Sequence, residues 1–137
     1  MKPAEELKLR TKEFALRIVE VFHALPRSED ARTLGRQLLR SGTSVAANYR
    51  AVCRSRSKAE FVARLGIVVE EIDETVFWLE LLVDSGIVSA VRLDNRCAKQ
   101  MNFLRFSSAH NLPQRASDPI RQSVNPSIRQ SKWRSSV

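Results

Sequence analysis

The stretch from Ser28 to Gly86 constrains the fold most, because it reads as two long helices separated only by the corner Arg54-Ser55-Arg56. The second of these helices opens with Ser57-Lys58-Ala59-Glu60. In such a capping box the serine hydroxyl accepts a hydrogen bond from a backbone N–H, and the glutamate accepts one from the N–H of the serine. The sequence therefore places a helix boundary at Ser57 and predicts an all-α fold.

Two further helices are expected on either side of this pair. Residues 4–24 carry an apolar stripe at helical spacing and stop before Pro26, because the residue before a proline avoids the helical region. Residues 90–107 follow the cap residue Ser89 and present the apolar positions Val91, Leu93, Cys97, Met101 and Leu104. We expect helices over residues 4–24, 28–54, 58–85 and 90–107, all within one bundle domain of residues 1–110.

The composition changes after residue 110. Residues 111–137 are rich in Ser, Pro, Gln and Arg, and they carry five bases against the single acid Asp118. The segment Ile120–Ser123 recurs as Ile128–Ser131, which is typical of low complexity and not of a folding unit. We interpret this segment as a disordered basic tail that could add nonspecific affinity for nucleic acid.

The helix of residues 28–54 has more apolar surface than one packing partner needs. Its expected core seam is Ala31, Leu34, Leu38, Gly42, Val45, Tyr49 and Val52, and a second row repeats every seven residues at Leu39, Ala46 and Cys53. Gly42 has small neighbours on both sides, which would let another helix approach closely. A simple bend at this glycine is the alternative reading.

A row of arginines runs along the same helix. Arg36, Arg40, Thr43, Ala47, Arg50 and Arg54 follow one another in steps of three and four residues, and Arg32 extends the row by one turn. The arginines could form a solvated face or pair with the acidic helix that follows. They could equally contact phosphates, because the guanidinium fork matches phosphate oxygens.

The overall charge favours the phosphate interpretation. The net charge of +8 suggests a polyanionic partner, and nucleic acid fits better than a membrane. The expected fourth helix adds bases of its own. The candidate nucleic-acid contacts are Arg32, Arg36, Arg40, Arg50, Arg54, Arg92, Arg96 and Lys99.

The sequence offers no catalytic or cofactor site that we recognise. Residues 70–84 hold six acids and no base, but a di-iron bundle site also needs Glu-x-x-His, which is missing. An outward acidic face or a contact between subunits is the simpler interpretation. No nucleophile–base pair or glycine-rich phosphate loop is present, so we expect no enzyme, no metal and no cofactor. Cys53 and Cys97 lack metal spacing, and no signal peptide or membrane span is evident, which predicts a cytoplasmic protein with reduced thiols.

Several segments resemble a known family. Leu38–Asn48, Ser57–Leu65, Glu70-Glu71 and Leu79–Leu82 are similar to the four-helix-bundle proteins encoded in intervening sequences of bacterial large-subunit ribosomal RNA genes. The resemblance spans about residues 7–107, and the Ser-Val-x-x-Asn segment that ends at Asn48 is its most specific part. Many relatives continue with Glu-Gly where this chain has Tyr49-Arg50, so no role of that pair carries over.

The resemblance implies an up-down antiparallel four-helix bundle that assembles as a ring-shaped homo-oligomer, a pentamer in characterised relatives. A related protein, the accessory factor of diversity-generating retroelements, binds nucleic acid and a reverse transcriptase, which implies nucleic acid as a partner here and a partner protein as a further candidate. The two apolar edges of the second helix suit a head-to-tail contact between copies. The expected interface residues are Leu39, Gly42, Ala46, Asn48, Cys53 and Trp78. The family brings no established enzymatic activity.

Overall fold

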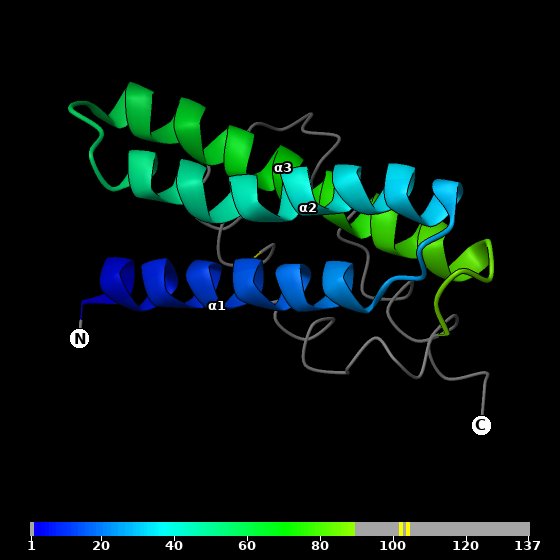
Figure 1. Ribbon diagram of the computed structural model, residues 1–137. Coiled ribbons are helices and arrows are strands. Elements are labelled where there is room, and N and C mark those ends of the chain that lie inside the picture. Colours follow the sequence, from blue (N-terminus) through cyan, green and yellow to red (C-terminus); the bar gives the residue numbers. More distant parts are fainter. Residues whose placement is uncertain (1, 90–101, 103, 105–137) are drawn as a thin grey trace.

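A computed structural model of the 137-residue chain describes residues 2–89, 102 and 104. These residues form three helices and no strand: α1 (Pro3–Ala24), α2 (Glu29–Val52) and α3 (Lys58–Asp84). Successive helices run antiparallel, and α2 packs against both α1 and α3 (Figure 1). The all-α prediction is confirmed, and the three helices lie within two residues of their expected bounds.

The fourth expected helix, residues 90–107, lies almost entirely outside the described residues. Two of its positions are described, Asn102 and Leu104, and both are helical. Leu104 is completely buried and belongs to the same hydrophobic core as α1, α2 and α3. The described residues therefore show three helices with a core that receives a further helical residue, and not a complete four-helix bundle.

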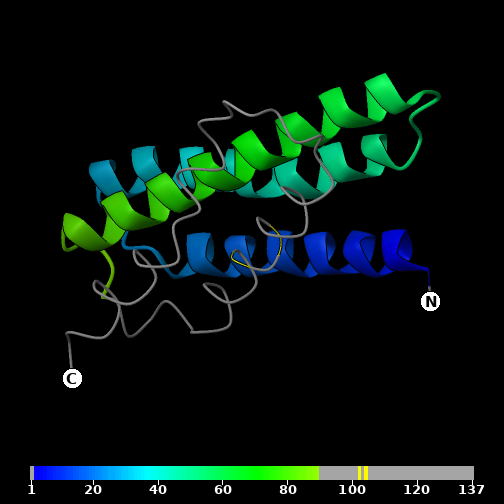
Figure 2. The ribbon, with the colours of Figure 1, turned by 180° about the vertical axis from the view of Figure 1, so that it is seen from behind.

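The core is a seam between the helices. From α1 it receives Leu7, Phe14 and Ile18, which belong to the apolar stripe of that helix. From α3 it receives Leu65, Val68, Val69, Ile72, Leu79 and Leu82. Figure 2 shows the same arrangement from behind, with α1 beside α2 along most of its length. Burying these aliphatic side chains is the main source of stability, at about 1.5–3 kcal/mol for each Leu, Ile or Val.

The buried positions of α2 follow a stricter repeat than the sequence analysis expected. They are Ala31, Gly35, Leu38, Gly42, Val45, Tyr49 and Val52, in strictly alternating steps of four and three residues, together with Ser41. Leu34 was expected in this seam, but it is only half-buried. Gly35 takes its place, because the side chains of Phe22 and Leu25 fill the space where a Cβ would project.

The ends of α2 and α3 follow the capping signals of the sequence only in part. At α3 the N–H of Glu60 donates to Ser57 Oγ over 3.1 Å, as the capping box predicts. Glu60 Oε2 accepts a hydrogen bond from the N–H of Arg56 (2.8 Å), one residue earlier than expected. At α2 the cap residue Ser28 makes no side-chain cap bond. Gly86, with φ of 76°, follows α3 in the left-handed conformation that commonly ends a helix.

Candidate nucleic-acid interface

The arginine row lies on the surface of α2, away from the core. Arg32, Arg36, Arg40 and Arg50 are all exposed, and so is Arg54, which follows the last turn of the helix. A shared outward face is what the spacing predicted. The other three candidate contacts, Arg92, Arg96 and Lys99, lie outside the described residues.

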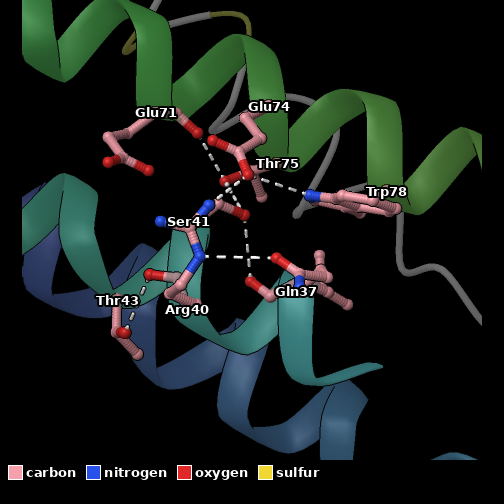
Figure 3. Close-up of polar contacts among 9 residues, drawn as sticks. Gln37, Arg40, Ser41, Thr43, Glu71, Glu74, Thr75 and Trp78 are labelled. Carbon is pink, nitrogen blue, oxygen red and sulfur yellow. Dashed lines mark hydrogen bonds and ion pairs between the residues drawn. The ribbon is translucent and has the colours of Figure 1, made fainter. Parts of the chain in front are cut away.

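Arg40 differs from the other arginines because it is already paired within the chain. Its Nη2 atom forms an ion pair with Oε1 of Glu74 on α3, and its Nε lies 3.4 Å from Oε1 of Gln37 (Figure 3). The same Glu74 oxygen accepts a hydrogen bond from Nε1 of Trp78 over 3.2 Å. The salt-bridge interpretation therefore applies to Arg40, whose charge Glu74 offsets.

The remaining arginines of the row stay available. Within the part of the chain that the structure describes, no carboxylate lies within ion-pair distance of Arg32, Arg36, Arg50 or Arg54. An exposed guanidinium keeps its fork of donors for an incoming anion and loses little hydration when it binds one. These four side chains are the part of the row that can contact phosphates.

A polar cluster beside the Arg40–Glu74 pair joins α2 to α3. The hydroxyls of Ser41 and Thr75 are both buried and lie 3.0 Å apart, and Thr75 also lies 2.7 Å from the carbonyl of Glu71 (Figure 3). Burial raises the pKa of the Glu71 carboxyl above its usual value, and nearby Glu74 adds to that effect while Arg40 opposes it.

This cluster corrects the interpretation of the acidic helix. We expected its six carboxylates on an outward face or at a contact between subunits. Glu70, Glu80 and Asp84 are indeed exposed, but Glu71, Asp73 and Glu74 are half-buried. Glu71 and Glu74 lie next to α2 of the same chain (Figure 3). Among the described residues, no group of three or more His, Cys, Asp or Glu side chains could hold a metal ion.

The residues expected at an interface between copies differ in how exposed they are. Leu39, Ala46, Asn48 and Trp78 are half-buried, and Cys53 is exposed. Gly42 is buried within the protomer, where it packs against Ile18 of α1. The close helix approach that Gly42 predicted therefore takes place inside one chain, and Gly42 is too buried to form much contact with a second copy.

Two basic residues that the sequence analysis did not select adjoin the row. Arg56 and Lys58 are exposed at the α2–α3 corner, beside Arg50 and Arg54 in the sequence. The signal was present as Arg54-Ser55-Arg56-Ser57-Lys58, where every second residue is a base. Helical spacing defined the arginine row. Arg56 and Lys58 do not continue that spacing, so this segment indicated only a helix boundary.

Comparison with known proteins agrees with the fold and with the resemblance noted above. A family model described as "23S rRNA-intervening sequence protein" matches residues 6–105. A crystal structure of a protein of unknown function from the S23 ribosomal protein family of Bacteroides thetaiotaomicron is similar, with a TM-score of 0.71 and 28% identity, over 80% of this chain and 94% of that chain. None of the curated proteins matches. Within the described residues, no helix is long and apolar enough to cross a membrane.

Proposed function

Since the chain belongs to the family of 23S rRNA-intervening sequence proteins, we propose that it is a nonenzymatic, oligomeric scaffold that binds nucleic acid through the basic surface of α2. The observation that carries this proposal is the set of four exposed arginines, Arg32, Arg36, Arg50 and Arg54, none with an ion-pair partner among the described residues. Each can neutralise a phosphate and release condensed counterions, which is the main source of nonspecific affinity.

Binding should be measured by fluorescence anisotropy with labelled 20-nucleotide RNA and DNA duplexes at several salt concentrations. We expect affinity at low salt and a steep linear fall of log K with log salt, with a slope of about −0.9 for each phosphate contacted on a DNA duplex. A chain that binds neither duplex at 50 mM salt, or whose affinity is indifferent to salt, would refute the proposal.

A second candidate function is a protein-assembly module whose arginines contact another copy, without nucleic-acid binding. Exposed apolar side chains on α3 favour assembly: Ile67 is 45% exposed and Phe77 is 52% exposed. Both lie among outward carboxylates, including Glu70, which would suit a basic partner surface such as the α2 row of a second copy. We propose that copies join through these surfaces, with the pentamer of characterised relatives as the expected size.

Solution mass tests the assembly surface, and duplex binding separates the two candidates. Phe77→Ser should lower the mass measured by sedimentation, whereas Leu9→Ser, which changes an equally exposed apolar side chain on α1 (51%), should not. If the arginines serve assembly alone, Arg36→Glu combined with Arg40→Glu will dissociate the oligomer, and no duplex will bind even to the intact wild type. A wild-type chain that sediments as a monomer at all concentrations would remove the assembly part of the proposal.

A further inference from the structure

We propose that nucleic acid contacts the protein at one end of the α2–α3 pair, the basic corner formed by Arg50, Arg54, Arg56 and Lys58, and not along the whole arginine row. The ligand class is the sugar–phosphate backbone of RNA or DNA. This inference rests on the proposed function and narrows it to a site that includes Arg56 and Lys58.

The two ends of the α2–α3 pair carry opposite charge. Residues 41–69, which surround the corner, contain five bases and the single acid Glu60. Residues 27–40 and 70–84 lie together at the other end, because α2 and α3 run antiparallel, and they contain four bases and eight acids (Figure 1). The pair is therefore positive by four charges at the corner and negative by four at the opposite end.

The bases of the basic corner are exposed, and among the described residues the side chains of Arg50, Arg54, Arg56 and Lys58 form no ion pair. The one nearby acid, Glu60, is already engaged. Its Oε1 pairs with Nη2 of Arg64 at 2.6 Å, and its Oε2 accepts the hydrogen bond from the backbone N–H of Arg56.

The beginning of α1 lies at the same end of the molecule as the corner (Figure 1). Its first-turn acids are also matched locally. Glu5 pairs with Lys8 at 3.7 Å, and Glu6 pairs with Arg10 at 2.8 Å. These carboxylates therefore subtract little from the positive field at the corner, because each is offset by a base one turn away.

The other half of the arginine row lies near more carboxylates, so the electrostatic potential there is less favourable for a phosphate. Arg32 and Arg36 share the first two turns of α2 with the exposed acids Glu29 and Asp30. Arg40 is offset by Glu74, and the acid-rich half of α3 runs alongside. Since the Debye length is about 8–10 Å at physiological salt, a phosphate near Arg32 also experiences these carboxylates.

Backbone dipoles do not reverse this difference. The corner joins the C-terminal, negative end of α2 to the N-terminal, positive end of α3, and two antiparallel helices largely cancel each other's dipole there. The side chains therefore decide the local potential. Arg50 lies in the last turn of α2 and Arg54 follows two residues after the helix ends, so both lie at the same end of the pair and can contact one strand.

The test compares two matched double variants, each of which removes two exposed arginines from the row. Arg50→Gln with Arg54→Gln should weaken duplex binding at 100 mM salt at least about tenfold and reduce the salt slope by about two. Arg32→Gln with Arg36→Gln should weaken binding less than about threefold. A third variant, Arg56→Gln with Lys58→Gln, should resemble the first, and circular dichroism confirms that each variant is folded.

The outcomes separate this inference from the proposed function. Equal losses in the two matched doubles, or a larger loss in the Arg32 and Arg36 double, would overturn the basic corner while nucleic-acid binding stands. A wild-type chain that binds no duplex refutes the proposed function itself. Poly-glutamate that competes as well as RNA at equal charge would show a general anion surface and overturn the assignment to a nucleic-acid backbone.

Discussion

Gly42 of α2 lies directly against Ile18 of α1, so closely that a Cβ on the glycine would come within 2.7 Å of both Cγ atoms of the isoleucine and 3.0 Å of its Cβ. Glycine lowers the helix propensity at this position, but it allows α1 and α2 to pack closely. Gly42→Ala should destabilise the protein by about 1–2 kcal/mol, because overpacking against the β-branched side chain exceeds the gain of about 1 kcal/mol in propensity. Urea denaturation measures the difference.

Gly66 of α3 provides the matched control. It also lies inside a long helix, but no heavy atom beyond its own local backbone lies within 4 Å of the position of an added Cβ. Gly66→Ala should therefore stabilise the protein by about 0.5–1 kcal/mol, the propensity term alone. If Gly42→Ala stabilised the protein as Gly66→Ala does, the packing of Gly42 on Ile18 would not hold in solution.

The partly buried carboxyl of Glu71 predicts a dependence of stability on pH. Burial raises its pKa in the folded state above the ordinary value of 4.5, and Oε2 accepts no hydrogen bond from the described residues. The unfolded chain therefore releases this proton at lower pH than the folded one. The contribution of Glu71 to stability is complete below pH 4.5 and is lost as the pH rises through the folded pKa.

Glu71→Gln should remove this dependence. The variant should melt at a higher temperature than the wild type at pH 7, and the difference should shrink as the pH falls towards 4. Thermal melts at intervals of half a pH unit test this, with Glu80→Gln, an exposed acid further along α3, as the control for loss of one negative charge. A difference in melting temperature that is constant across the range would contradict the raised pKa.

Much of the fold could be predicted because its signals are local. Helical spacing, Pro26, the Ser57 cap and Gly86 each act within a few residues, so the bounds of α1, α2 and α3 followed from the sequence. The choice between Leu34 and Gly35 could not be predicted in the same way. It depends on Phe22 and Leu25, which fill the space beside Gly35 only after α1 has packed on α2.

The candidate site was predicted less completely, for a related reason. Spacing along α2 correctly placed Arg32, Arg36, Arg40 and Arg50 on one exposed face. It could not show that Arg40 pairs with Glu74, 34 residues away, because that contact depends on how α2 and α3 are rotated about their axes. Spacing along one helix also could not show which element packs against Gly42. It was therefore expected at a contact between copies, although α1 of the same chain packs against it.

The shared oxygen of Glu74 predicts a modest energetic coupling. The side chains of Arg40 and Glu74 are 55% and 35% exposed, so their ion pair should contribute less than about 1 kcal/mol. A double-mutant cycle of Arg40→Ala and Glu74→Ala should give a coupling energy of about 0.3–1 kcal/mol that decreases at 1 M salt. A coupling energy of zero at low salt would show that the pair does not persist in solution.

Trp78 reports on the same carboxylate independently. In a Trp133→Phe background, which leaves Trp78 as the single tryptophan, Glu74→Ala should shift the fluorescence emission to longer wavelength. The indole N–H loses its protein acceptor and is hydrated instead. Arg40→Ala keeps that acceptor and should leave the emission maximum nearly unchanged, which distinguishes loss of the hydrogen bond from loss of charge.

Ser28 and Ser57 precede α2 and α3 in the same way in the sequence, but the structure predicts that their side chains contribute differently to stability. Ser57 Oγ accepts the N–H of Glu60, whereas the side chain of Ser28 caps no backbone N–H, and Asp30 accepts the N–H of Ala31 near the start of α2 instead. Ser57→Ala should therefore cost about 1 kcal/mol of stability, the usual loss for a capping hydroxyl, and Ser28→Ala only a few tenths. Chemical denaturation of both variants measures this directly. Equal losses would mean that the Ser28 hydroxyl stabilises α2 as much as a capping hydroxyl does, although its side-chain partner is Asp30 and not a backbone N–H.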